Sequence, residues 1–290
     1  MKRVFFLAGL LLFVASVCTA QRLPELAVPD NYKLTFAPDF TKNNFIGDEI
    51  IQVRVLKPTS EIVLNAAEID FETVTITGGS TTQKAKVTVD KEKEIATLTV
   101  GSAIQPGPAT IQIRYTGILN NELRGFYLGK DNDGRKYAAT QLEATDARRA
   151  FPSFDEPAYK ATFDVVVTAD QGMTVISNTK AISDTPGPAG KHTVRFATTP
   201  KMSSYLVAMV VGNFEYIEGS ADGIPIRVYT SPGKKEMGTF ALDAAENIMR
   251  YYNHYFGIKY PYGKLDLVGL ADFSAGAMDL RATKTVLTVG

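Results

Sequence analysis

Polar and hydrophobic residues alternate along most of the chain between residues 31 and about 216. The clearest alternating runs cover residues 32–36, 50–55, 95–100 and 110–115. A period of two with many β-branched residues is typical of strands that are buried on one face. Glycine- and proline-containing turn signals separate the runs, at residues 78–79, 106–108, 131–134 and 186–188. The pattern predicts a large antiparallel β domain.

The pattern changes after Gly223. Residues 224–229 predict one more strand, which Pro232 and Gly233 end. Apolar residues then recur three or four positions apart, at Met237, Phe240, Ala241, Ala244, Ala245, Ile248, Tyr252 and Tyr255. This stripe predicts an amphipathic helix over residues 235–256, with Gly257 just past its end. Another strand over residues 265–270 completes the opening of an α/β domain.

Composition excludes several classes of function. The 290 residues carry 31 basic and 31 acidic side chains, so no electrostatic footprint indicates nucleic acid or an acidic membrane surface as a partner. The chain has one cysteine, Cys18, and two histidines, His192 and His254. That inventory builds neither a disulfide framework nor a metal site of several Cys and His ligands.

The first twenty residues have the layout of a secretory signal peptide. Lys2 and Arg3 precede an apolar run over residues 4–17, and small residues follow up to Ala20. The run is short for a permanent membrane span. A buried N-terminal helix is the alternative, and a lipoprotein is weaker because Val17 is bulky. We expect an exported protein, periplasmic or extracellular, with no permanent membrane span after cleavage.

Two segments carry residues suited to binding chemistry. In residues 140–157, T-Q-L-E-A-T-D-A-R-R-A-F-P-S-F-D-E-P, Gln141 and Glu143 are two apart and face the same way if the segment is extended. Such an amide and carboxylate can receive an ammonium and a peptide group. A salt-bridged surface loop is the alternative. In residues 271–279, small residues and Gly276 allow another backbone to approach, and Asp279 adds negative charge. A glycine-containing loop is the alternative there.

Together and in this order, the two segments resemble the aminopeptidase N family of zinc metallopeptidases (gluzincins), over about residues 29–278. The resemblance implies a mainly β fold, a saddle-like antiparallel β-sandwich domain followed by a thermolysin-like domain, and removal of N-terminal residues from peptides. It implies that Glu143 binds the α-amine of peptide N-termini and that Gln141 lines the first side-chain pocket. It also implies that Gly276, Ala277 and Met278 form an edge strand for the peptide backbone.

The chain also departs from that family. The family's G-A-M-E-N is G-A-M-D-L here, so Asp279 is one methylene short and Leu280 supplies no amide. The H-E-x-x-H zinc motif is missing, and His192 and His254 lie 254 − 192 = 62 positions apart. We expect both histidines to be structural or solvent-facing. We therefore expect Zn²⁺ in the full-length family but no zinc ligand and no catalytic residue in this chain.

These features predict three regions: a signal peptide over residues 1–20, a β domain over residues 21–222, and the incomplete beginning of a catalytic domain over residues 223–290. The first hypothesis is that the chain is the N-terminal fragment of an exported zinc aminopeptidase, inactive alone. The second hypothesis is a non-catalytic exported peptide-binding β module.

Overall fold

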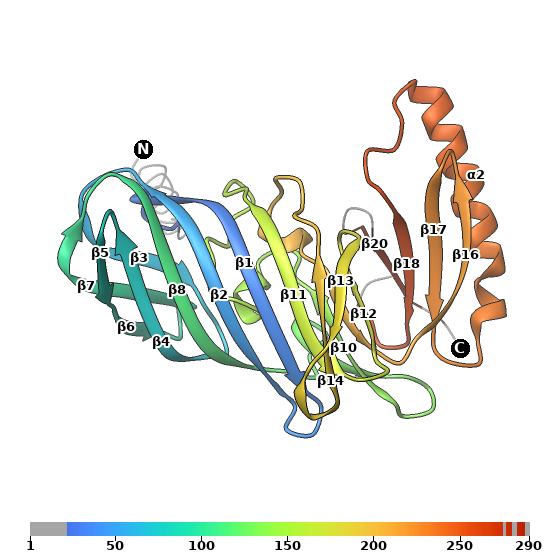
Figure 1. The fold of residues 1–290 in the computed structure, drawn as a ribbon, viewed down its shortest axis with the longest axis horizontal. Helices are drawn as coiled ribbons and strands as arrows, with labels where there is room; N and C mark the ends of the chain where they lie inside the picture. Colours follow the sequence, from blue (N-terminus) through green and yellow to red (C-terminus); the bar gives the residue numbers. More distant parts are fainter. Residues whose placement is uncertain (1–21, 275–276, 280–282, 288–290) are drawn as a thin grey trace, which may run out of the picture.

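A computed structural model describes residues 22–274, 277–279 and 283–287 (Figure 1). The predicted signal peptide and Gly276 lie outside this part of the chain. The largest sheet has eight strands, in spatial order β13 (Ala181–Pro186), β14 (Lys191–Phe196), β11 (Thr162–Asp170), β1 (Ala27–Asp39), β2 (Asn44–Val55), β8 (Gly107–Ile118), β4 (Ile69–Gly78) and β5 (Thr81–Lys84). All its pairings are antiparallel except that of β1 with β11, which is parallel.

Two smaller sheets cover the inner face of the large one. One has the order β3 (Thr59–Asn65), β7 (Ile95–Ile104) and β6 (Lys86–Asp90). The other has the order β12 (Thr174–Ser177), β15 (Met209–Gly212), β10 (Lys136–Gln141) and β9 (Gly125–Lys130). Inward-facing residues of all three sheets form one hydrophobic core. The predicted mainly β, sandwich-like domain is confirmed.

Aromatic side chains of the core also hold the segment that follows β10. Tyr32 stacks on Phe163 with ring centroids 5.0 Å apart. The Tyr32 hydroxyl accepts a hydrogen bond of 3.1 Å from the backbone of Phe154, and the Tyr115 hydroxyl donates one of 2.9 Å to the carbonyl of Ala150. Buried tyrosines usually pair their hydroxyls in this way, and here the pairing fixes residues 150–154 against the core.

The C-terminal part forms a separate five-stranded sheet. Its order is β16 (Glu215–Ala221), β17 (Ile224–Thr230), β18 (Leu265–Leu270), β20 (Thr283–Leu287) and β19 (Ala277–Asp279). Helix α2 (Thr239–Phe256) connects β17 to β18, which pair in parallel. Because β16 pairs with β17, the change of sheet comes before Glu215, ahead of the boundary predicted after residue 222. The four 3₁₀ helices of the described residues are η1 (Ala147–Arg149), η2 (Pro188–Gly190), η3 (Ser204–Leu206) and η4 (Lys235–Gly238).

Helix α2 ends where the sequence predicted, but it presents a different face to the sheet. Gly257 adopts φ 62°, a left-handed conformation that glycine takes without strain, and ends the helix. Met249, with Leu242 and Ala245, packs in a cluster with residues of β17 and β18. Most of the predicted apolar stripe points outward instead. Its exposed members are Met237, Phe240, Ile248, Tyr252 and Tyr255. The helix is apolar on more than one side, and periodicity does not say which side meets the sheet.

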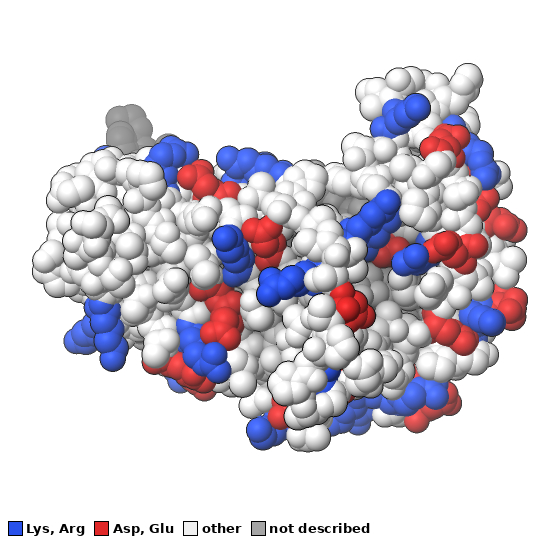
Figure 2. All heavy atoms as spheres, in the orientation of Figure 1, with Lys and Arg blue, Asp and Glu red and all other residues white. Residues whose placement is uncertain are grey.

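On the face drawn in Figure 2, basic and acidic side chains are interspersed. Among the residues that the structure describes, no helix has the length and apolar character needed to cross a membrane.

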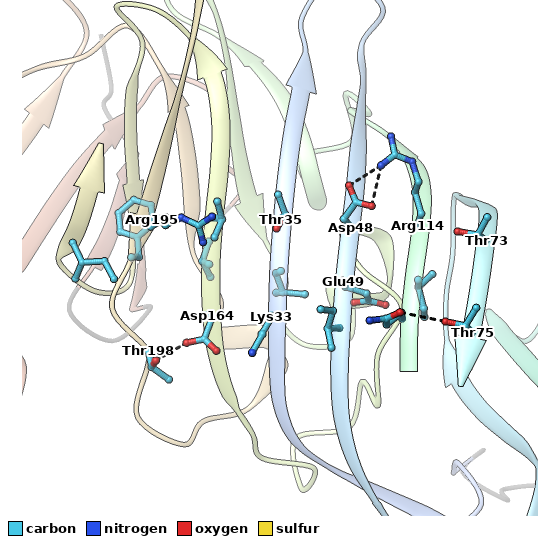
Figure 3. A pocket seen from close by; sticks show the side chains of 18 residues that line it. Lys33, Thr35, Asp48, Glu49, Thr73, Thr75, Arg114, Asp164, Arg195 and Thr198 are labelled. Atoms are coloured by element: carbon cyan, nitrogen blue, oxygen red, sulfur yellow. Dashed lines mark hydrogen bonds and ion pairs between the residues drawn. The ribbon is translucent and has the colours of Figure 1, made fainter. Parts of the chain in front are cut away.

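The outer face of the eight-stranded sheet carries a groove of about 810 Å³ that charged and apolar side chains line together (Figure 3). Strand register places Arg114 directly opposite Asp48, and the guanidinium donates to both carboxylate oxygens at 3.0 Å. The next residue of β2, Glu49, points the other way into the core. Neither of its carboxylate oxygens has a hydrogen-bond partner among the described residues. Burial therefore raises the pKa of Glu49 well above its ordinary value of 4.5.

We predict that Glu49→Gln stabilises the protein at neutral pH. With its pKa raised on folding, Glu49 binds its proton more tightly in the folded state, so stability falls as the pH rises above about 4.5. Glutamine removes this loss, so the urea midpoint of the variant should exceed that of the parent at pH 7 and converge with it near pH 4.5. Glu61→Gln, at an exposed position, should change neither value. A variant less stable than the parent at pH 7 would contradict the prediction.

Candidate functional site

The segment that carries Gln141 and Glu143 begins at the end of β10. This strand lies between β9 and β15, and Gln141 pairs with Gly125. The Thr140 hydroxyl accepts a 2.9 Å hydrogen bond from the backbone of Met209, which fastens the strand end. The strand stops at Gln141, so the extended geometry assumed for both residues does not reach Glu143. Gln141 is buried, whereas Glu143 is exposed on the turn that follows.

Arg149 holds the turn in place from its far end. Its side chain is only 8% exposed and donates 2.8 Å to Asp146 and 2.6 Å to Glu68, with a third ion pair to Glu94. Gly125 is required beneath it, because a Cβ there would lie 2.7 Å from Cβ of Arg149 and its φ is +70°. The turn is thereby fixed to two other loops.

Arg148 forms the second half of the same network. Its Nε lies 3.0 Å from Asp155, and its Nη1 lies 3.2 Å from Glu94, the residue that also binds Arg149. Asp155 is buried and accepts a 2.8 Å hydrogen bond from Ser204. Burial raises the pKa of Asp155, although these two partners oppose the shift. The charged residues of this segment thus form a largely buried scaffold rather than a surface loop.

Glu143 is an acidic residue of this segment that forms no ion pair with Arg148 or Arg149. Among the described residues, its carboxylate has no ion-pair or hydrogen-bond partner and faces solvent. The buried Oε1 of Gln141 likewise has no hydrogen-bond partner in this part of the chain. The structure therefore presents a free carboxylate two residues from an unpaired amide oxygen, on a backbone that buried contacts hold.

Two tyrosines near the segment that carries Gln141 and Glu143 form hydrogen bonds with the second predicted segment, residues 271–279. The hydroxyls of Tyr127 on β9 and Tyr137 on β10 donate to the carbonyl of Asp272, at 2.9 Å and 3.0 Å. The Asp272 amide donates back to Tyr137 at 2.8 Å, and the Lys130 amide donates to the Asp272 carboxylate at 3.0 Å. Both tyrosines share a hydrophobic cluster with Met278. The β9–β10 hairpin thus anchors the segment that leads to β19.

The predicted edge-strand residues lie on β19. Ala277 and Met278 pair with β20 in antiparallel register, and β19 is the last strand of its sheet. Met278 is buried and Ala277 is exposed. Asp279 is the third residue of the strand, opposite Lys284. Gly276 falls outside the described residues.

The side chains that the structure describes do not fit a zinc ion. His192 lies on β14 and its Nδ1 is 2.7 Å from Asp184, whereas His254 is exposed on α2. No group of three His, Cys, Asp or Glu side chains within these residues is arranged to hold a metal. Both histidines occupy structural or solvent-facing positions, as the sequence predicted.

Comparison with known proteins gives the family. Residues 28–206 match the Peptidase M1 N-terminal domain, and residues 240–288 match the Peptidase family M1 domain. The chain belongs to peptidase family M1. It carries the N-terminal domain of that family and a short match to the peptidase domain, as the resemblance to aminopeptidase N indicated.

The chain is similar to several aminopeptidases, and the share of each relative's length that it covers varies. It is 40% identical over 267 residues to the puromycin-sensitive aminopeptidase of Caenorhabditis elegans, covering 89% of this chain and 28% of the relative. It is 37% identical over 296 residues to aminopeptidase N of Acetobacter pasteurianus, covering 96% and 82%. It is 39% identical over 281 residues to aminopeptidase 2 of Candida albicans, covering 95% and 30%. The M1 chain therefore spans less than a third of two of these relatives.

The sequence did not reveal that Tyr127 and Tyr137 hold Asp272. Nor did it reveal the buried ion-pair network of Arg148 and Arg149. Tyr137 lies three positions before the segment that carries the resemblance. A tyrosine at an inward position of a strand is a usable signal, because its hydroxyl needs a buried partner. The partner itself, Asp272, lies 135 residues away and has no local signature.

We predict that Tyr137→Phe loosens residues 271–274. The change removes one donor and one acceptor at Asp272 and leaves a backbone amide unpaired, which costs about 1–3 kcal/mol. Hydrogen exchange of this segment should accelerate, and the free energy of unfolding should fall by a similar amount. Tyr251→Phe on α2 is the matched control, since Tyr251 is exposed and its hydroxyl binds none of the described residues. Unchanged exchange at residues 271–274 would refute the anchoring role.

Proposed function

We propose that this chain supplies the part of an M1 aminopeptidase that binds the amino terminus of a peptide. In this proposal Glu143 receives the α-ammonium group and Gln141 lines the pocket for the first side chain. The β19 segment, with Gly276, Ala277 and Met278, aligns the peptide backbone. The observation that carries the proposal is the exposed carboxylate of Glu143, which has no partner among the described residues on an otherwise ion-paired loop.

The chemistry of these groups supports the assignment. An exposed ion pair by itself contributes only about 0–1 kcal/mol. Strand addition along a sheet edge adds backbone hydrogen bonds, and a side-chain pocket adds selectivity. The three elements together favour an extended peptide with a free amino end over an isolated amine. We expect weak affinity, because Glu143 is exposed to solvent.

We further propose that the chain binds peptides without cleaving them. Its sequence has no H-E-x-x-H motif, and the described histidines do not fit a metal site. The zinc ion that the resemblance implies for the family would supply an activated water, but no residue here is assigned to hold it. The second hypothesis, a self-contained binding module, shares this binding mode. The exposed apolar stripe of α2 does not favour it, since soluble monomers rarely leave such a stripe uncovered.

We predict that Glu143→Gln weakens binding of a fluorescent tripeptide with a free amino terminus by up to about fivefold. An exposed ion pair contributes about 0–1 kcal/mol, and 1.4 kcal/mol corresponds to a factor of ten. Fluorescence polarisation should also show that N-acetylation of the tripeptide weakens binding to the parent chain by a similar factor.

Glu92→Gln, at an exposed loop position, is the matched control and should bind like the parent. Equal affinity for the free and acetylated tripeptides would overturn the role of Glu143. Release of amino acids from the tripeptide by the purified chain would overturn binding without cleavage.

Export is proposed from the pattern of residues 1–20 alone. Expression in a bacterium with an intact secretion system should place the chain outside the cytoplasm. Its intact mass should correspond to a chain that begins at Gln21. A cytoplasmic product that retains Met1 would contradict the proposal.

A further inference from the structure

A second cavity lies where the five-stranded sheet meets the β domain. Its volume is about 330 Å³. Residues 179–181, which lead into β13, line one side of it, and residues of β17 and the start of β18 line the other. None of the residues proposed for the amino-terminus site lines this cavity.

A buried ion pair forms part of the cavity wall. Lys264 and Asp266 are 8% and 2% exposed and bind each other. The Lys264 ammonium also donates a 2.6 Å hydrogen bond to the carbonyl of Ser177 in the β domain. Asp266 is the only acidic residue among the described residues that line the cavity, and Lys264 already neutralises it.

Two more cations line the same cavity. Arg227 lies directly beside Asp266 in the strand register, and its Nε is bound by Glu218, which does not line the cavity. Lys180 is exposed, and its ammonium makes no ion pair within the described part of the chain. Its Cε lies 3.2 Å from the position that a Cβ on Gly263 would occupy, so it reaches the residue next to Lys264.

The lining therefore contains three cations and one carboxylate. This excess of positive charge faces a partly desolvated space. Burial lowers the pKa of Lys264, Asp266 opposes that shift, and the neighbouring charge of Arg227 adds a smaller repulsive contribution that lowers the pKa further. An anion in the cavity would relieve that repulsion, and the guanidinium and ammonium donors match the geometry of an oxyanion.

We propose that this cavity binds a small oxyanion, either phosphate or a carboxylate such as that of a free amino acid, between Lys180, Arg227 and Lys264. Lys180 belongs to the β domain, whereas Arg227 and Lys264 belong to the five-stranded sheet unit. The bound ion joins the two units and stabilises their contact. The proposal does not depend on the function assigned to Glu143.

The test is thermal unfolding of the full chain at pH 7, with sodium chloride holding the ionic strength constant. Phosphate and N-acetylglycine are titrated separately, so the two arms tell phosphate from carboxylate binding. A ligand of the folded state should raise Tm in a saturable way. Lys180→Met should weaken the apparent affinity about tenfold, which corresponds to about 1.4 kcal/mol. Because Lys180 is exposed and its ammonium forms no ion pair with the described residues, this variant keeps the buried contacts intact.

Lys57→Met is the matched control, since Lys57 is exposed and lies outside the cavity lining. It should bind the anions like the parent chain. A Tm that follows ionic strength alone, with no saturable response to either anion, would overturn the proposal. An equal loss of affinity in Lys57→Met and Lys180→Met would overturn it as well, because the effect would then be non-specific.

Discussion

The buried guanidinium of Arg149 is the constraint on which the candidate site depends. A charge with 8% exposure is tolerated only when it is fully paired, and Arg149 is paired with three carboxylates. Asp146 belongs to its own turn, whereas Glu68 and Glu94 come from the loops that follow β3 and β6. The planar fork of an arginine satisfies several carboxylates at fixed angles, which a lysine does not. The turn after β10 is therefore positioned by the three-stranded sheet as well as by its own strand.

This arrangement leaves the Glu143 carboxylate without an ion pair among the described residues. Arg148 and Arg149 form ion pairs with Glu94, Asp146 and Asp155, so each of these carboxylates already has a partner. Glu143 lies on the solvent side of the same turn and is left available for a ligand. A carboxylate on a backbone held by buried ion pairs is pre-organised, so under the proposed function little conformational entropy would be lost when a peptide amine binds.

The site is assembled from two structural units. In the β domain, the hydroxyls of Tyr127 and Tyr137 donate hydrogen bonds to the carbonyl of Asp272, which follows β18. In the other direction, Lys264 donates a hydrogen bond to the carbonyl of Ser177 in the β domain. The first contact sets the position of β19 relative to the β9–β10 hairpin. The second contact lies at the cationic cavity, where Lys264 lines the wall. Changes at this junction are therefore expected to reach the edge strand as well as the cavity.

The sequence by itself determined the elements that local pattern specifies. Alternation identified parts of strands β1, β2, β7 and β8, strand β18 was predicted with its observed bounds, and Gly257 marked the end of α2. The residue patterns at positions 140–157 and 271–279, taken together, were also enough to indicate the family. These features depend on neighbouring residues and on turn chemistry, so they can be read from a short stretch of chain.

Only the tertiary structure decided the contacts between distant segments. It showed the parallel pairing of β1 with β11, placed β16 in the second sheet, and turned most of the apolar stripe of α2 outward. It also showed that the charged segment over residues 140–157 is largely buried, because Arg149 forms ion pairs with Glu68 and Glu94. These outcomes depend on partners tens of residues away, and the energy of burying a charge or choosing a helix face has no signature in the local sequence.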